Sequence, residues 1–373
     1  MKKIALILIC CCLSFSASAG DKELFGQVYN LLLNEYIEDV EIPLFFDPVF
    51  SAIEREDKDI DVVAGKNTVT IYYKGKIHKV YTYPINPKDV KKWAEFTDFL
   101  LTEVKKISPI LEHKDFELAE VMLYDGTQKF DKNMRYFPIL DVGQTTEKIQ
   151  AYNSGQQENK ILYIRLGTIN EFTTEEIIKT FEKFQSPQGI VLDLRGNKGG
   201  YLKHALDIAD VFLNKGLMIY TIGKNPGKRK NYRATDGELY KGVPMAVLVD
   251  GQTASAAEVI ALALQNNKRA VVVGSQTYGK GTVQNIYQLE NDAHIALTTE
   301  KFFGFDKASI EDIGMRPDIC SAYFETTEED FEKIINSGTD FGCPKSVRHS
   351  DFDLDVALYL LEKQISAKKS SLK

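Results

Sequence analysis

Ser255 and Lys280 stand in surroundings that could make them a nucleophile and its base. Ser255 follows an apolar run, 244–249, and a tight Asp-Gly turn, and alanine and valine dominate the residues after it. The pattern predicts a buried strand that leads through the turn into a helix. The serine hydroxyl would then lie at the positive end of that helix, where main-chain N–H groups can receive an oxyanion. The commoner use of Ser255 or Thr253 here would be as an ordinary helix cap.

Lys280 stands between two glycines in a segment that follows a second apolar run, 270–274. Gly279 and Gly281 would let other main chain approach the lysine closely. Apolar surroundings disfavour the charged form of a lysine and lower its pKa, so that a neutral amine could accept the proton of a serine. A solvated lysine in a glycine-rich turn is the alternative.

A third polar segment, 189–200, also joins an apolar strand to a glycine-rich turn. Sheets of the α/β class place ligands at the carboxyl ends of their strands, and a turn there can offer main-chain N–H groups. Gly199 and Gly200 close this turn. Asp193 and Arg195 are expected to stabilise it as a structural pair and not to react.

Other motifs of hydrolases and nucleotide-binding proteins are missing from the sequence. The five histidines are scattered, without the His-Glu-x-x-His spacing of a zinc peptidase: His78, His113, His204, His294 and His349. No Gly-x-Ser-x-Gly elbow occurs, which disfavours an ordinary hydrolase triad. No Walker loop occurs, and no strand is followed by Gly-x-Gly-x-x-Gly. The serine and lysine segments are therefore the best candidates for chemistry.

The elements around these segments alternate between strands and helices. Apolar runs predict strands at 161–166, 189–194, 218–222, 245–249 and 270–273, and helical periodicity predicts helices at 173–185, 201–214 and 255–267. This alternation favours an α/β layer with largely parallel strands. The helix at 173 begins with Thr-Thr-Glu-Glu, which predicts a capping box. The basic segment 223–232 is expected to be a loop.

The first third of the chain has a different pattern. Helical spacing predicts one or two amphipathic helices in 21–56 and more helix in 87–123, whereas β-branched and aromatic residues predict a hairpin in 68–83. The stretch 144–160, rich in glutamine and asparagine, is expected to be a linker or exposed loop. We therefore predict a signal peptide, an N-terminal helical and hairpin region, a catalytic core and a C-terminal helical segment at 1–19, 20–150, 151–323 and 324–373.

The first nineteen residues have the pattern of a secretory signal: a cationic start, a short apolar stretch and Ala-Ser-Ala before Gly20. A retained membrane anchor is the alternative to cleavage. Cleavage would leave two cysteines, Cys320 and Cys343, for which an oxidising compartment favours a disulfide. Two unpaired buried thiols are the alternative, and two cysteines do not make a metal site.

The net charge of the chain is -7, and it would become -9 once the two positive charges of Lys2 and Lys3 were removed. An acidic surface of this kind disfavours a nucleic-acid partner.

In order and spacing, the three polar segments resemble the carboxyl-terminal processing proteases, also called tail-specific proteases. That family has Asp-Leu-Arg-x-Asn-x-Gly-Gly after a strand, a Ser-Ala-(Ser/Ala)-Glu nucleophile turn and a Gly-Lys-Gly-(Thr/Ser)-Val-Gln base segment. The matching residues here are 193–200, 255–258 and 279–284. The likeness begins near 161 and extends to 314–318, which is similar to the closing loop of the family.

The resemblance implies that Ser255 is the nucleophile, Lys280 the general base and Gln284 the residue that orients the lysine amine. It also implies an oxyanion hole made by the main-chain N–H groups of Ala256 and Gly199. The implied fold is a crotonase-like α/β core, here with an appended N-terminal helical and β-hairpin region. The implied reaction is hydrolysis of peptide bonds through an acyl-enzyme, without a metal or an organic cofactor.

Two features depart from the family. Most members carry a PDZ domain directly before the catalytic core, and between 137 and 161 there is no room for one. Lys198 also stands where the family usually has proline or a small residue. Catalysis is therefore better supported than recognition of a substrate's carboxyl terminus.

We therefore expect an exported serine endopeptidase, periplasmic or secreted, without a stable membrane span, that acts on unstructured or carboxyl-terminal segments of polypeptides. The alternative is a catalytically silent relative that binds a peptide or another ligand. A penicillin-binding-type acyl transferase would need Ser-x-x-Lys, but Glu258 occupies the lysine position.

Overall fold

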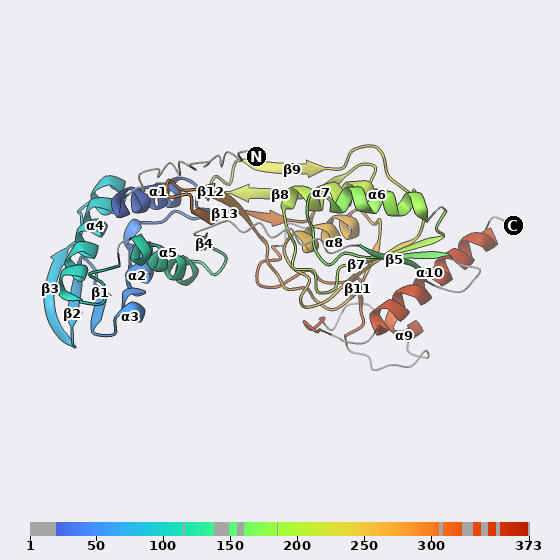
Figure 1. Ribbon diagram of the computed structural model, residues 1–373. Coiled ribbons are helices and arrows are strands. Elements are labelled where there is room, and N and C mark those ends of the chain that lie inside the picture. Colours follow the sequence, from blue (N-terminus) through green and yellow to red (C-terminus); the bar gives the residue numbers. More distant parts are fainter. Residues whose placement is uncertain are drawn as a thin grey trace, which may run out of the picture. The chain divides into compact units, whose positions relative to one another are not determined.

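The computed structural model describes most of the chain after the predicted signal peptide (Figure 1). The described residues are 20–114, 116–137, 149–154, 160–184, 186–305, 309–322, 331–336, 342–347 and 351–371. The predicted signal at 1–19 and much of the predicted linker at 144–160 lie outside them. Within the described part of the chain, no helix has both the length and the apolar character that a membrane crossing requires.

The chain forms two compact units. The first unit comprises Met1–Asp141 and Gln284–Thr298, and the second comprises Val142–Val283 and Thr299–Lys373. Residues 284–298 were expected in the catalytic region but pack with the first unit. The strands β12 (Thr282–Gln288) and β13 (His294–Phe303) carry the chain from one unit to the other and back. We describe each unit by itself.

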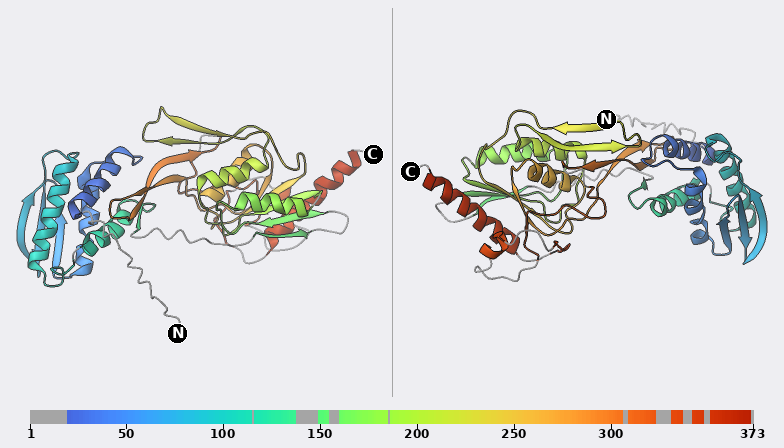
Figure 2. Two further views of the ribbon diagram at one scale, coloured as in Figure 1. Left: turned by 45° about the horizontal axis from the view of Figure 1, so that its top comes forward. Right: turned by 180° about the vertical axis from the view of Figure 1, so that it is seen from behind.

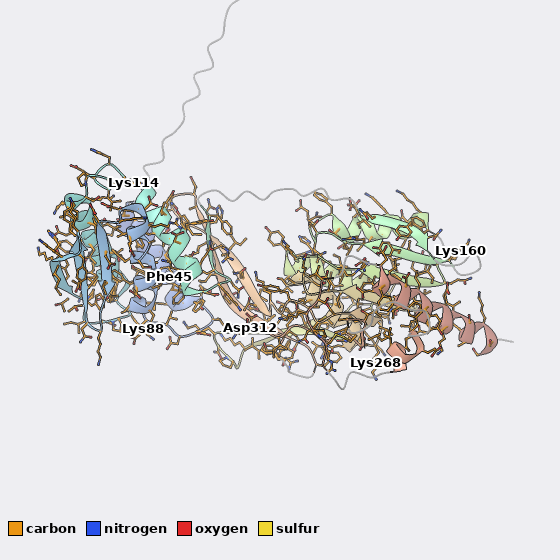
Figure 3. All side chains as sticks on the ribbon, turned by 90° about the horizontal axis from the view of Figure 1, so that it is seen from below. Phe45, Lys88, Lys114, Lys160, Lys268 and Asp312 are labelled. Carbon is orange, nitrogen blue, oxygen red and sulfur yellow. A yellow bond between two sulfur atoms is a disulfide. The ribbon has the colours of Figure 1, made fainter. Side chains whose placement is uncertain are left out.

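The first unit packs helices against a three-stranded antiparallel sheet, and β4 (Arg135–Phe137) pairs antiparallel with the start of β13 in the same unit. Its helices are α1 (Asp21–Asn34), α2 (Ile42–Phe50), α3 (Ile53–Glu56), α4 (Val90–Ile107) and α5 (Phe116–Phe130), and its sheet has the order β1 (Ile60–Ala64), β2 (Thr68–Tyr73) and β3 (Lys76–Thr82). Aromatic side chains fill the interior, among them the fully buried Trp93 and Phe45; Phe45 is labelled in Figure 3. Helices where the spacing predicted them, and a hairpin at 68–83, are thereby confirmed.

The second unit contains a six-stranded sheet that is covered on both faces (Figures 1 and 2). Its strand order is β14 (Ile319–Cys320), β11 (Val271–Gly274), β10 (Met245–Val249), β7 (Gly189–Asp193), β6 (Ile161–Arg165) and β5 (Gln150–Ser154). All neighbours are parallel except β5 and β6. Every residue of β7 and β10 is buried, as expected for parallel strands between two layers.

The helices of the second unit lie on the two faces of this sheet. One face packs against α6 (Thr173–Lys183), α7 (Leu202–Val211) and α8 (Ala256–Asn266), and the other against α9 (Phe331–Asn336) and α10 (Phe352–Ser371). Side chains of one strand alternate between the layers, since Ile190 and Leu192 face one core and Val191 the other. This arrangement confirms the α/β class.

Three local predictions were wrong. Residues 150–154 form the edge strand β5 and not a loop, and part of the basic loop at 223–232 belongs to the strand β9 (Arg229–Arg233), which pairs with β8 (Leu217–Gly223). Polar residues can serve in such strands because one face is exposed. The capping box of α6 is also absent: Thr173 is already helical, and its hydroxyl bonds to Asn170.

Candidate active site

The three polar segments follow three neighbouring parallel strands. The turn 194–200 comes after β7, the turn 250–255 after β10, and the segment 275–281 after β11. Because the carboxyl ends of parallel strands meet at one edge of the sheet, these segments lie together there. The fold thus collects residues that are far apart in the sequence into one site.

Ser255 has an unusual main-chain conformation. It is the N-cap residue of α8, with φ 56° and ψ -121°. A non-glycine residue rarely adopts a positive φ, and such strain persists only where the surroundings hold it. The chain therefore makes a sharp turn between β10 and α8 that carries the serine at its apex.

Hydrogen bonds join the turn that carries Ser255 to the turn that follows β7. The carboxylate of Asp250 accepts the main-chain N–H of Gly196 at 3.0 Å and the N–H of Thr253 at 2.9 Å. The N–H of Ala254 donates to the main-chain carbonyl of Asn197 at 2.9 Å. The two turns are thereby held as one unit beside the serine.

Gly199 lies directly against the serine turn. A Cβ atom built on it would lie 2.8 Å from the main-chain nitrogen of Ala256 and 3.0 Å from the Cβ of Ser255, and its φ is +94°. Only glycine fits this conformation and this space. As the first residue of α8, Ala256 has an N–H group without an intrahelical acceptor. The N–H of Gly199 donates to Asn197 Oδ1 at 2.8 Å.

Glu258 joins the serine segment to the lysine segment. Its side chain is fully buried, and its two oxygens accept four hydrogen bonds: from the main-chain N–H groups of Ser255 (2.8 Å), Gly279 (2.8 Å) and Lys280 (2.9 Å), and from the hydroxyl of Thr277 (2.5 Å). Burial raises the pKa of Glu258, and these hydrogen bonds act in the opposite direction. One carboxylate therefore fixes the main chain of both predicted catalytic residues.

The lysine segment is also held from the side opposite Glu258. The N–H of Asp312 donates to the carbonyl of Gly279 at 2.9 Å, and the carboxylate of Glu311 accepts the N–H of Gly281 at 2.6 Å. A Cβ built on Gly279 would lie 2.6 Å from the main-chain nitrogen of Gly314. The glycine beside Lys280 thus permits the close approach of main chain that the sequence predicted.

Asp193 and Arg195 form a buried structural pair, as expected. The guanidinium Nε of Arg195 donates to Asp193 Oδ1 at 3.0 Å, and the Tyr163 hydroxyl donates to Oδ2 at 2.7 Å. Burial raises the pKa of Tyr163, and Asp193 raises it further. Asp353 of α10 approaches Arg195 at 3.5 Å. The pair fixes the start of the turn that ends at Gly199.

Gln284 lies in the first unit, at its boundary in the chain. Its side-chain amide donates to the main-chain carbonyl of Asn133, in the same unit. Its predicted role toward Lys280 stays a prediction. The role of Glu258 was missed, although its position, acidic and surrounded by Ala256, Ala257 and Val259, was a signal of a buried carboxylate with a special task.

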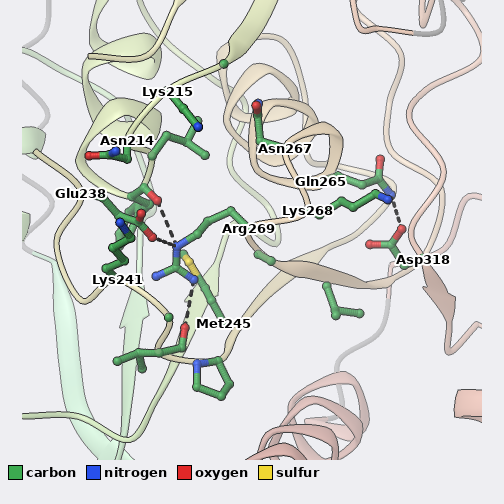
Figure 4. Close-up of a pocket in the computed structure, with 18 of the residues that line it drawn as sticks. Asn214, Lys215, Glu238, Lys241, Met245, Gln265, Asn267, Lys268, Arg269 and Asp318 are labelled. Carbon is green, nitrogen blue, oxygen red and sulfur yellow. Dashed lines mark hydrogen bonds and ion pairs between the residues drawn. The ribbon is translucent and has the colours of Figure 1, made fainter. Parts of the chain in front are cut away.

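A separate open pocket of about 1230 Å³ lies at the opposite edge of the sheet, at the amino ends of β10 and β11 (Figure 4). Arg269 occupies it, paired with Glu238 at 2.9 Å and donating to the main-chain carbonyls of Phe212 and Val243. Burial lowers the pKa of this arginine, and Glu238 opposes the shift. These contacts join the ends of neighbouring elements, and neither Ser255 nor Lys280 lines the pocket.

Among the described residues, no three His, Cys, Asp or Glu side chains gather in a way that could hold a metal ion.

Residues 160–321 match the model of peptidase family S41. This match covers the three motifs and confirms their resemblance to a family of peptidases. Among its relatives are the carboxyl-terminal processing protease of Synechocystis sp., 37% identical over 207 residues (55% of this chain and 47% of the relative), and that of Bartonella bacilliformis, 38% identical over 168 residues (43% and 39%).

A solved structure, the photosystem II D1 C-terminal processing protease, is similar at 27% identity over 50% of this chain and 46% of that one, with a TM-score of 0.40. The chain spans less than half of the length of the two curated relatives named above.

Proposed function

We propose that the chain is an exported serine endopeptidase that hydrolyses peptide bonds of protein substrates with Ser255 as nucleophile and Lys280 as general base. The observation that carries the proposal is the buried carboxylate of Glu258, which accepts the main-chain N–H groups of both residues. A shared anchor of this kind is suited to a pair that must keep a constant separation. The match of residues 160–321 to the model of a peptidase family supports the same conclusion.

The reaction would proceed through an acyl-enzyme. The neutral amine of Lys280 takes the proton of the Ser255 hydroxyl as the oxygen attacks the carbonyl carbon of the substrate. The tetrahedral oxyanion is stabilised by main-chain N–H groups, and Lys280 passes the proton to the leaving amine. Water then attacks the ester, Lys280 removes its proton, and the serine hydroxyl is restored as the acid product leaves.

Ala256 and Gly199 are the proposed donors of the oxyanion hole. Ala256 meets the requirement directly because its N–H opens a helix beside the serine. In this structure the N–H of Gly199 donates to Asn197 Oδ1. To donate to the oxyanion, it must first release that oxygen. Gln284 is proposed to orient the Lys280 amine, as its place in the third motif implies.

The proposed substrates are unstructured or carboxyl-terminal segments of polypeptides. Curated relatives are named as carboxyl-terminal processing proteases, which supports a polypeptide substrate. A catalytically silent relative that only binds a peptide is the alternative. A protein that only binds a peptide would not need the main-chain N–H groups of Ser255 and Lys280 to share one buried carboxylate.

Two substitutions test the proposal directly. Ser255→Ala and Lys280→Ala should each abolish cleavage of casein while the circular dichroism spectrum stays unchanged. Ser370→Ala on α10 and Lys215→Ala at the exposed rim of the pocket serve as matched controls and should cleave at the wild-type rate. A fluorophosphonate probe should label Ser255 of the wild type, as located by mass spectrometry. Full activity of either dyad variant would overturn the proposal.

Export has its own test. The full chain, expressed in a bacterium, should be recovered from the periplasm or the medium with an amino terminus at Gly20, because the preceding residues have the pattern of a secretory signal. Edman sequencing of the recovered protein measures this. Recovery of the uncleaved chain from the cytoplasm would contradict export.

A further inference from the structure

A short segment near the carboxyl terminus, 342–347, contacts the turn after β10 and the segment after β11, and we call it the strap. Cys343 in the strap forms a disulfide with Cys320 at the end of β14, with a Cα–Cα distance of 5.8 Å. Both cysteines are buried. The strap is therefore covalently fixed to the sheet beside β11, the strand that leads to Lys280.

The strap contacts the turn that leads to Ser255. The N–H of Gly251 donates to the main-chain carbonyl of Ser346 at 2.7 Å, and the Ser275 hydroxyl donates to the same carbonyl at 2.8 Å. A Cβ on Gly251 would lie 3.1 Å from that oxygen, so the two segments are in close contact. One carbonyl of the strap thus connects the turn after β10 with the start of the segment after β11.

The strap also holds the segment that carries Lys280, chiefly through Lys345. Its ammonium donates to the main-chain carbonyls of Tyr278 at 2.7 Å and Asp312 at 3.0 Å. Asp312, labelled in Figure 3, in turn donates its N–H to the carbonyl of Gly279. Lys345 therefore connects two loops at a point two residues before Lys280.

These contacts are made to the carbonyl groups of the same two peptide units whose N–H groups donate to Glu258. Glu258 accepts the N–H groups of Gly279 and Lys280, whereas Lys345 and Asp312 bond to the carbonyls of Tyr278 and Gly279. Both sides of the same peptide groups are thereby occupied. A displacement of about 1 Å in a catalytic group can lower a rate by about a hundredfold, so the strap has the position needed to control turnover.

We propose that the strap is a positioning element for the catalytic pair, that Lys345 is its positioning residue, and that full turnover requires the disulfide between Cys320 and Cys343. The inference rests on the proposed peptidase function. Reduction by a dithiol breaks the S–S bond: the dithiol supplies two electrons and two protons, forms its own disulfide, and leaves two cysteine thiols. The freed strap no longer holds Lys345 against the two loops.

The first test concerns Lys345. Lys345→Met should lower kcat on an unstructured peptide by about tenfold or more, with KM and the thermal midpoint nearly unchanged, because only the lysine segment is displaced. Lys345→Arg should restore most of the rate, since a guanidinium can reach the same carbonyls. Lys368→Met is the matched control: Lys368 also donates to a main-chain carbonyl, that of Gly242, and its loss should leave kcat unchanged.

The second test concerns the disulfide. Treatment of the folded protein with dithiothreitol, followed by alkylation and mass spectrometry, counts the freed thiols, and the peptidase rate is measured on the same sample. If the buried bond resists the reagent, the double variant Cys320→Ser, Cys343→Ser replaces the treatment. Either sample should retain its far-ultraviolet circular dichroism and lose kcat by about tenfold. In the treated protein, the loss of kcat should be proportional to the fraction of disulfide reduced.

The outcomes separate this inference from the proposed function. A wild type that neither cleaves casein nor reacts at Ser255 with a fluorophosphonate would refute the peptidase proposal. A wild type that cleaves, together with a Lys345→Met variant and a reduced protein that cleave equally fast, would refute the role of the strap alone. A fall in kcat only in parallel with unfolding would also overturn it, because the strap would then be purely structural.

Discussion

The carboxylate of Glu258 accepts the main-chain N–H of Lys280 at 2.9 Å, across 22 residues of chain. The same oxygen accepts the N–H of Ser255. The proposed nucleophile and its proposed base therefore depend on one buried acceptor, and removal of that acceptor should affect both. The consequences can be measured.

Glu258→Gln keeps the shape of the side chain but replaces one accepting oxygen by an NH₂ group. At least one main-chain N–H would then face a donor, so kcat should fall at least tenfold and the free energy of unfolding by about 1–3 kcal/mol. Steady-state kinetics and urea unfolding measure the two effects. Glu175→Gln, which removes a surface carboxylate paired with Lys179, should change neither, and an equal effect in both variants would contradict the assignment.

The pH dependence follows from the same carboxylate. Burial raises the pKa of Glu258 above its ordinary value of 4.5. Protonation converts an accepting oxygen into a donor, so kcat should fall as the pH drops through the raised pKa. The stability contribution has the opposite sign: it is present below the unfolded-state pKa and is lost as the pH rises through the folded-state pKa.

Wild type and Glu258→Gln should therefore differ in the pH dependence of kcat and in the pH dependence of the unfolding free energy. The variant should lack the acidic limb of kcat that Glu258 causes. The difference in unfolding free energy between the two proteins should change with pH across the same range. Superimposable acidic limbs would show that another group titrates there.

Gly199→Ala should cost both stability and activity. The new Cβ would lie 2.8 Å from the nitrogen of Ala256, and the φ of +94° adds strain. Gly237→Ala is the control, because its φ is +137° but nothing lies within 4 Å of the new atom. The control should lose about 1 kcal/mol of unfolding free energy and keep full kcat. Gly199→Ala should lose more and cleave at least tenfold more slowly, and equal behaviour would refute the crowding argument.

Arg195→Met should destabilise the second unit strongly. It leaves the fully buried carboxylate of Asp193 without its cation, which costs about 3–5 kcal/mol. Guanidinium chloride unfolding measures the loss. Lys203→Met removes an exposed pair with Asp207 and should cost less than about 0.5 kcal/mol. A loss in Arg195→Met as small as this would mean that the Tyr163 hydroxyl and the main-chain N–H of residue 195 satisfy the carboxylate without the guanidinium.

Much of the fold could be predicted from the sequence because burial leaves a local pattern. The strands β7 and β10 are runs of apolar residues covered on both faces, and the helices beside them have one apolar side. The strands β5 and β9 were missed because they lie at sheet edges, where polar residues are tolerated and the local pattern is that of a loop. Their pairing depends on the neighbouring strand and not on their own composition.

Some features of the candidate site could likewise be predicted from the sequence, and others could not. The motifs around Ser255 and Lys280 could be found because their residue types, order and spacing can be read directly from the linear sequence. The strained φ of Ser255 and the bond from Gly199 to Asn197 could not, because local residue types permit several conformations there. The contacts of the strap were also beyond prediction: Lys345 bonds to residues 33 and 67 positions away.

The sequence by itself thus predicted which strands are buried, which three segments are candidates for chemistry, and which two cysteines follow the predicted signal peptide. Only the tertiary structure decided that Glu258 bonds to the main chain of both candidate catalytic segments, and that the strap bonds to carbonyl groups of the lysine segment. The physical reason is that hydrophobic periodicity is a property of neighbouring residues. A buried carboxylate or ammonium must instead be satisfied by whichever N–H and C=O groups the packed sheet brings to it.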